Sequence, residues 1–114
     1  MSRMTPTYIG EIIQKGLNLK GWTSTKTSNY TVTEGDYIVP VDTSSGAVTI
    51  TLGSEIVVKG RVVIIKDVGG SAGTNAITVA TEGSETIDGG STASISSNYG
   101  KLMLISDGSN WYSI

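Results

Sequence analysis

The sequence predicts an all-β fold of short strands, arranged as an antiparallel sandwich, a barrel or a trimeric β-prism, with a short N-terminal helical or extended segment. Two patterns predict this fold. Apolar residues alternate with Ser and Thr along several short stretches, and Gly, Asp and Asn recur between those stretches. The length of 114 residues is enough for one domain.

The N-terminal residues 1–22 carry the only helical pattern of the chain. Gly10 and Gly16 weaken this helix, and a helix so short is marginal in water, so its apolar face needs something to pack against. We therefore predict that residues 1–22 are an attachment segment and that residues 23–28, which are polar and rich in Ser and Thr, are a linker. The side chains that would make the attachment recur at the spacing of one helical face: Ile9, Ile12, Ile13 and Leu17.

The β module is predicted to span residues 29–114 and to hold eight short strands. Pro40 indicates an edge strand or a bulge, and Asp-Gly pairs at 88–89 and 107–108 are typical of tight turns. The predicted strands are 30–32, 37–41, 47–52, 61–66, 76–80, 93–96, 101–105 and 110–114.

The alternation of side chains predicts which residues enter the core. It is cleanest at 47–52, where Thr49 and Thr51 face away from the apolar residues between them. The runs 61–66 and 101–105 are apolar almost without interruption, which is typical of strands that are buried on both faces. The predicted core residues are Val48, Ile50, Leu52, Val63, Ile65, Ile77, Val79, Leu102 and Leu104.

The composition argues against several classes of function. The chain has no Cys and no His, so it lacks thiolate chemistry, the commonest general base and the commonest metal ligand. We expect no cofactor and no enzymatic activity. The net charge of −2 and the scattered Lys and Arg residues predict no nucleic-acid partner, and no apolar run approaches the length of a membrane span. We also expect no secretory signal, because residues 1–7 lack an apolar region.

Three carboxylates lie close together in the sequence, at Glu82, Glu85 and Asp88. They are candidates for an acid–base pair or a Ca²⁺ site, but their spacing differs from that of an EF-hand loop. A solvated turn is the favoured interpretation, with Asp88 bonding its own backbone ahead of Gly89.

Two further polar features have simple structural interpretations. Lys66 and Asp67 end a buried run and are expected to form a surface ion pair worth less than about 1 kcal/mol. The stretch 69–74 resembles a phosphate-binding loop only in its glycines, because the Lys and the helix of a P-loop do not follow it.

The aromatic residues are all Trp or Tyr, since Phe is absent. Most are expected in the core or at an interface, and Trp111 is expected to cap the core with its indole N–H bonded locally. Aromatic rings also stack on sugars. Candidate contacts to a host-surface glycan are Tyr99, Trp111 and Tyr112.

From residue 29 to residue 114 the chain resembles a module common in phage tail-fibre and related virion proteins. The stretches that carry the resemblance are Tyr30-Thr31-Val32, Asp36-Tyr37, Val41-Asp42-Thr43-Ser44, Val48-Thr49-Ile50-Thr51-Leu52, Gly60-Arg61, Ile64-Ile65-Lys66-Asp67, Gly73-Thr74-Asn75-Ala76-Ile77-Thr78-Val79, Glu85-Thr86-Ile87-Asp88-Gly89, Asn98-Tyr99-Gly100 and Ser106-Asp107-Gly108-Ser109-Asn110-Trp111.

The resemblance implies a β-rich unit, usually trimeric, near the end of a fibre on the exterior of a virion. No long fibre shaft accompanies the module in this sequence, which fits a small head fibre, a capsid decoration protein or an isolated fragment better than a tail fibre. The leading hypothesis is a homotrimeric virion structural protein that binds another virion protein through residues 1–22. The alternatives are a glycan-binding receptor tip, a subunit of an extracellular filament and, last, an enzyme.

Overall fold

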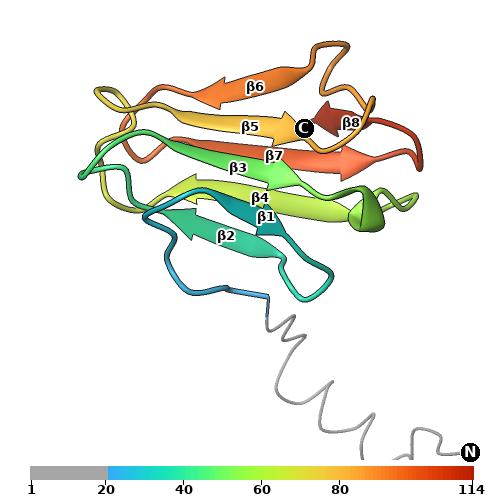
Figure 1. Cartoon of the computed structure of the whole chain (residues 1–114), viewed down its shortest axis with the longest axis horizontal. Helices are drawn as coiled ribbons and strands as arrows, with labels where there is room; N and C mark the ends of the chain where they lie inside the picture. The colour runs from blue at the N-terminus through green and yellow to red at the C-terminus, as the bar shows by residue number, and fades with distance from the viewer. Residues whose placement is uncertain (1–20) are drawn as a thin grey trace, which may run out of the picture.

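The computed structural model describes residues 21–114, which form a sandwich of two four-stranded sheets (Figure 1). The all-β prediction is confirmed, and the attachment residues Ile9, Ile12, Ile13 and Leu17 lie outside the described residues. Nothing in residues 21–114 forms a helix long and apolar enough to cross a membrane. The elements are β1 Tyr30–Val32, β2 Ile38–Val41, β3 Val48–Leu52, the 3-10 helix η1 Ser54–Ile56, β4 Val62–Asp67, β5 Ile77–Thr81, β6 Thr92–Ile95, β7 Lys101–Ser106 and β8 Trp111–Ser113.

The chain crosses from one sheet to the other after each of its first four strands. One sheet has the order β1-β3-β5-β6 and the other β2-β4-β7-β8. Each crossing reverses the direction of the chain, so two successive crossings restore it (Figure 1). As a result, β1 pairs with β3, β3 with β5 and β2 with β4 in parallel. Only the later pairs, β5 with β6, β4 with β7 and β7 with β8, are antiparallel.

The prediction of an antiparallel sandwich or barrel is therefore corrected in two respects. Both sheets are mixed, and both stay open, so the molecule is a sandwich and not a closed barrel. The physical reason is that the turns after β1 to β4 lead across the core instead of back along the same sheet. A strand buries the same side chains against the core in either arrangement, so alternation alone does not distinguish the two.

The core lies between the sheets and contains the predicted residues with one exception. Eight of the nine predicted side chains are buried, whereas Leu102 is half-buried and packs against the edge of the core. The alternation at β3 is confirmed, since Val48, Ile50 and Leu52 are buried and the threonines between them are not. The core also includes Val32, Val39, Val41, Ile56, Ala72, Ile87, Ile95 and Trp111.

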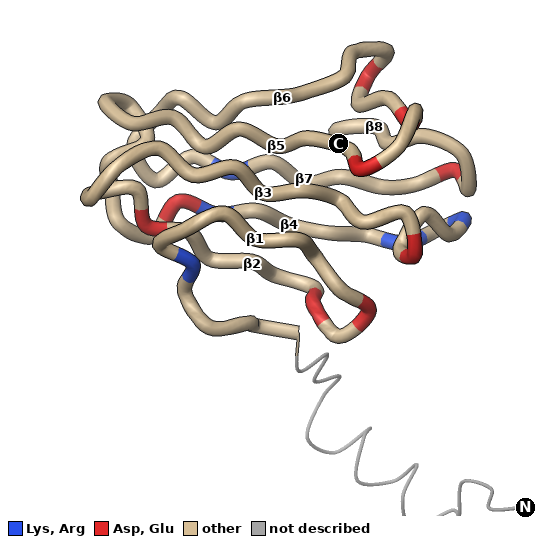
Figure 2. Tube along the Cα trace, in the orientation of Figure 1, with Lys and Arg blue, Asp and Glu red and all other residues tan. Residues whose placement is uncertain are grey.

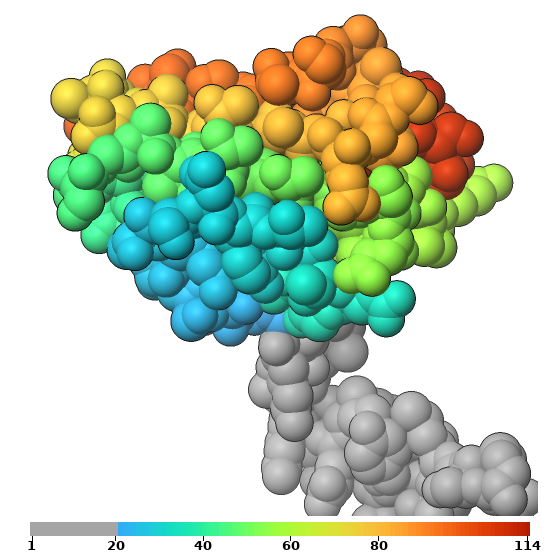
Figure 3. Space-filling view, in the orientation of Figure 1, coloured from blue at the N-terminus to red at the C-terminus, as the bar shows by residue number. Residues whose placement is uncertain are grey.

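The outer faces of the two sheets differ in chemistry. The outer face of β1-β3-β5-β6, which Figure 3 views, carries small and hydroxyl-bearing side chains in two cross-strand rows. The outer face of β2-β4-β7-β8 is aliphatic and aromatic except at one end, where Lys66 and Lys101 are cross-strand partners. The two rows on the first face are Thr31, Thr51, Ala80 and Thr92, and then Thr49, Thr78 and Ser94.

The apolar runs at β4 and β7 were predicted to be buried on both faces, and this prediction is wrong for the described chain. In β4, Val63 and Ile65 are fully buried, but Val62 and Ile64 on the other side of the strand are only half-buried. In β7 the outward-facing apolar residues are likewise half-buried. The reason is that nothing in residues 21–114 covers the outer face of this sheet.

Residues 21–28 lie against β2, although the sequence predicted them to be the end of the attachment segment and a linker. The carbonyl of Gly21 accepts the N–H groups of Tyr37 and Ile38, at 2.9 and 2.8 Å. The N–H of Lys26 donates to Pro40 at 2.9 Å, and isolated parallel bridges join Trp22 to Ile38 and Lys26 to Val41. The β body therefore includes residues 21–28.

Charged residues concentrate at the two ends of the sandwich, in the turns between strands (Figure 2). The middle of each strand is uncharged, and the charges within strands are Lys66 and Asp67 at the end of β4 and Lys101 at the start of β7. The broad faces of the sandwich are thus almost free of charge.

Replacing a core residue should destabilise the fold strongly. Ile50→Ala or Leu104→Ala is expected to lower the free energy of unfolding by about 2–5 kcal/mol, because each side chain is fully buried and would leave a cavity. The melting temperature should then fall by about 10 °C or more. Ser94→Ala on the exposed outer face is the matched control and should shift it little. An unchanged melting temperature in the core variants would contradict the assignment of faces.

Candidate functional site

The most densely bonded carboxylate of the described residues is that of Asp67, which is buried at the end of β4. Its two oxygens accept four backbone N–H groups, and the side chain is fully buried. The donors are Gly69 and Gly70 at 3.1 Å each, Ala72 at 3.1 Å and Tyr99 at 2.8 Å. The first three belong to the loop after β4 and the fourth to the loop before β7, so a single carboxylate holds both loops together.

The environment of Asp67 sets its ionisation. Burial alone would raise the pKa of its carboxyl, but the hydrogen bonds from Tyr99, Ala72, Gly70 and Gly69 outweigh burial and lower the pKa below its usual value. The predicted surface pair of Lys66 with Asp67 is therefore wrong. Lys66 Nζ instead donates to the carbonyl of Tyr99.

The glycine-rich stretch 69–74 does bind an anion, but this anion is the carboxylate of the protein's own Asp67. Three of the N–H groups in and beside this stretch point at Asp67, and that of Gly73 donates to Asn98 Oδ1 at 2.8 Å. Backbone N–H groups in such a concave arrangement bind anions. Because the protein's own carboxylate occupies them, the loop offers no phosphate site.

The same use of polar side chains extends over the whole sandwich. Every Asp of the chain accepts a hydrogen bond from a backbone N–H, and each of the four Asn residues in the described part bonds to a backbone group. These bonds fasten the turns at both ends of the strands. The residues are Asp36, Asp42, Asp67, Asp88 and Asp107, with Asn29, Asn75, Asn98 and Asn110.

Asp36 is a second buried carboxylate and closes the turn between β1 and β2. One of its oxygens accepts Tyr30 Oη at 2.5 Å, the N–H of Thr33 at 2.9 Å and Thr33 Oγ1 at 3.1 Å. Burial would raise the pKa of Asp36, but the bonds from Tyr30 and Thr33 lower it below its usual value. The same bond, with burial, raises the pKa of Tyr30.

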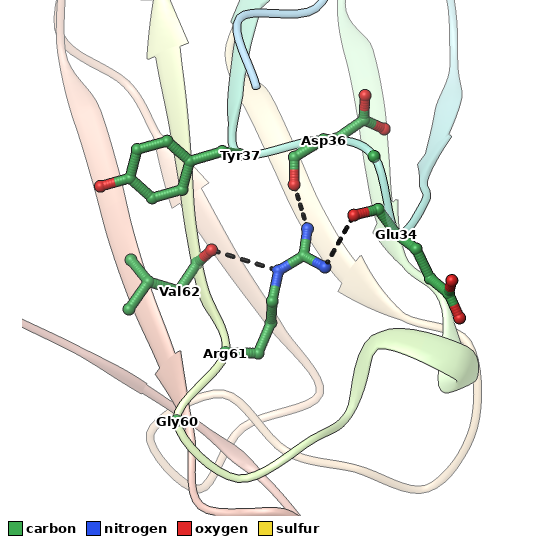
Figure 4. Close-up of a pocket in the computed structure, with 7 residues that line it drawn as sticks. Glu34, Asp36, Tyr37, Gly60, Arg61 and Val62 are labelled. Atoms are coloured by element: carbon green, nitrogen blue, oxygen red, sulfur yellow. Dashed lines mark hydrogen bonds between the residues drawn. The ribbon is translucent and has the colours of Figure 1, made fainter. Parts of the chain in front are cut away.

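A shallow depression of about 370 Å³ lies beside that turn and is lined by residues 34–37 and 60–62 (Figure 4). Arg61 extends its guanidinium across it and donates to the carbonyls of Thr33, Glu34, Asp36 and Val62. The guanidinium of Arg61 is thus hydrogen-bonded to the backbone of the β1–β2 turn and connects that turn to the start of β4.

The three clustered carboxylates do not converge on one point. Glu82 Oε1 accepts the N–H of Ser54 at 2.9 Å, and Glu85 Oε1 accepts that of Gly83 at 3.3 Å. Asp88 does not bond its own turn as predicted, because its carboxylate reaches β8 and accepts the N–H and Oγ of Ser113. Residues 21–114 contain no group of three or more side chains placed to hold a metal ion.

The three candidate glycan contacts do not form one surface. Trp111 is fully buried in the core, and its Nε1 has no hydrogen-bond partner, so the predictions of a glycan contact and of a locally bonded indole are both corrected. Tyr99 is 61% exposed at the start of β7, and Tyr112 is 44% exposed beside Ile105 near its end. They are about 20 Å apart along the strand, given the rise per residue.

Sequence reasoning missed the roles of Asp67, Asp36 and Arg61. For Asp67 a signal was present, because an aspartate followed by Gly-Gly within two residues is well placed to accept backbone N–H groups. The contributions of Tyr99, Tyr30 and the turn carbonyls come from distant parts of the chain. No protein-family model matches this chain, and no curated protein matches its sequence.

The Asp67 carboxylate should stabilise the fold in a pH-dependent way. Asp67→Asn is expected to lower the free energy of unfolding by about 1–3 kcal/mol near neutral pH, because the amide NH₂ faces N–H groups that need an acceptor. Since the pKa of Asp67 in the folded state lies below the ordinary 3.8, its contribution is complete above pH 3.8 and is lost as the pH falls through the folded-state value. The difference in the free energy of unfolding between Asp67→Asn and the wild type should therefore become smaller below pH 3.8.

Urea unfolding of both proteins, near neutral pH and at about pH 3, measures this difference. Asp42→Asn is the control, because Asp42 accepts a single exposed N–H, from Ser44. A stability difference for Asp67→Asn that stays constant over this pH range would show that the ionised carboxylate does not hold the two loops.

Proposed function

We propose that this protein is a non-enzymatic structural subunit of a virus particle. It assembles with copies of itself, as a trimer, and stands on the exterior of the particle as a fibre or capsid-decoration element. The observation that carries the proposal is the use of the polar side chains. All five aspartates and the four described asparagines bond the protein's own backbone, so they rigidify the turns of the sandwich.

This distribution of polar groups is what a rigid building element needs. Catalysis requires a polar group that is free to exchange a proton or to attack a substrate. Asp67 and Asp36 instead have lowered pKa values because they are bonded as acceptors, which stabilises their ionised forms and makes them poor general bases at neutral pH. The absence of His and Cys from the chain supports the same interpretation.

The virion assignment rests on the sequence resemblance of residues 29–114 to phage fibre modules. Low charge also supports it, since 16% of the residues are charged against about 25% in ordinary soluble domains, and self-assembly covers such surfaces. In this proposal residues 1–20 attach the subunit to another virion protein. They end immediately before Gly21, whose carbonyl is hydrogen-bonded to Tyr37 and Ile38 at the edge strand β2, so the attachment would be connected directly to the sandwich.

A receptor tip that binds host-surface glycans is the second candidate function, and one observation favours it. The exposed ring of Tyr99 lies over Gly70, on a backbone with a φ of +59°, a conformation that non-glycine residues rarely adopt. Such strain is often associated with function. A glycan array probed with the wild type and with Tyr99→Ala separates this function from a purely structural one, because only a receptor tip gives binding that the substitution removes.

The purified chain should have a mass three times the 11.9 kDa of a single chain. Assembly is expected because a domain of this size, when alone, buries a smaller fraction of its surface than a larger domain does. Sedimentation equilibrium at micromolar concentration measures the mass. A single-chain mass under those conditions would contradict self-assembly.

Deleting residues 1–20 should leave the oligomer folded but abolish its incorporation into particles. The circular dichroism spectrum and the mass of the truncated protein report on folding and assembly, and co-sedimentation with particles reports on attachment. A truncated protein that still co-sediments, or one that unfolds, would contradict the role of the segment as an attachment element.

A further inference from the structure

The outer face of β2-β4-β7-β8 carries a continuous band of apolar side chains, called the apolar face below. One row crosses the whole sheet, because Trp22 bridges to Ile38, Ile38 pairs with Ile64, Ile64 pairs with Met103, and the N–H of Ile114 donates to the Met103 carbonyl. A second row joins Val62, Ile105 and Tyr112. The apolar face consists of Trp22, Ile38, Val62, Ile64, Met103, Ile105, Tyr112 and Ile114.

The apolar face contrasts with the corresponding surface on the other sheet. The rows on β1-β3-β5-β6 consist of Thr, Ser and Ala, which suit contact with water. The two central strands beneath the apolar face, β4 and β7, are apolar on both sides, a pattern typical of strands whose two faces are both covered. Their composition therefore indicates a cover that residues 21–114 of one chain do not supply.

The size of the apolar face fits contact between proteins. Trp22 is 61% and Ile114 68% exposed at the two ends of the first row, Tyr112 is partly exposed, and the other five side chains are half-buried. If a large side chain offers on the order of 150–250 Å², the exposed parts amount to about 500 Å². Three such faces packed around one threefold axis would together remove about 1,500 Å² from water, an area in the range of specific interfaces.

We propose that copies of this chain meet through the apolar face. This inference rests on the proposed function and names the surface that performs the assembly. Further copies offer the same eight side chains, so they match the face in chemistry, and in a trimer each face would contact both neighbouring copies around the threefold axis. The segment 1–20 of the same chain offers a narrower match, because the helical face predicted for it from the sequence has only four large aliphatic residues.

Substitutions on the two faces of the full-length protein test this proposal. Ile64→Lys places a charge at the centre of the apolar face, and Thr78→Lys places one at a central, half-buried position of the other outer face. Sedimentation equilibrium should show the single-chain mass for Ile64→Lys at concentrations where the wild type and Thr78→Lys have the oligomer mass. Circular dichroism and thermal melting monitor the fold of each protein.

A double variant, Trp22→Ser with Ile114→Ser, tests the same face with substitutions that should leave the fold intact. Both residues are largely exposed in the single chain, so replacing them removes little of its core. It should raise the dissociation constant by about 100-fold or more, because large apolar residues dominate such interfaces. If Ile64→Lys and the double variant keep the oligomer mass, the apolar face is not the contact, although self-assembly stands. If the wild type itself has the single-chain mass, both this inference and the proposed self-assembly are overturned.

Discussion

The carboxylate of Asp67 is the interaction on which the arrangement of the loops depends. It lies at the end of β4, the strand that pairs in parallel with β2 and antiparallel with β7. Its four N–H donors fix the loop that leads from β4 to the opposite sheet, and they fix Tyr99 just before β7 returns. A buried ionised group is tolerated only when it is fully bonded, so this site forces the two loops into one arrangement. Asp36 acts in the same way at the other end of the sandwich.

These hydrogen bonds to the loops are needed because the chain crosses between the two sheets. Parallel neighbours such as β1 and β3 have no tight hairpin to set their register, because β2 intervenes in the other sheet. Register is then set by side-chain alternation and by bonds in the connecting segments, such as that from the N–H of Thr49 to Asn29 Oδ1. Rigid turns and uncharged broad faces together suit a building element whose surface is completed by neighbours.

The difference between the two outer faces connects the fold to assembly. Both sheets have the same number of strands and share one core, yet one face presents threonines and the other a row from Trp22 to Ile114. Stability of the single sandwich does not require this asymmetry. An aliphatic outer face serves burial against another surface, whereas a hydroxyl-rich face remains favourable in water.

The sequence by itself determined the β class, the positions of the strands and half of the core, because alternation and turn residues are local properties that leave a direct pattern in the chain. Its patterns also marked β4 and β7 as apolar on both sides. Only the tertiary structure decided that the early strands pair in parallel, that the indole N–H of Trp111 is buried without a partner and that Asp67 is a bonded core group. These features depend on contacts between residues far apart in the chain, such as Asp67 with Tyr99. Local pattern does not encode which of several compatible turns will lead a strand across the core or back along its own sheet.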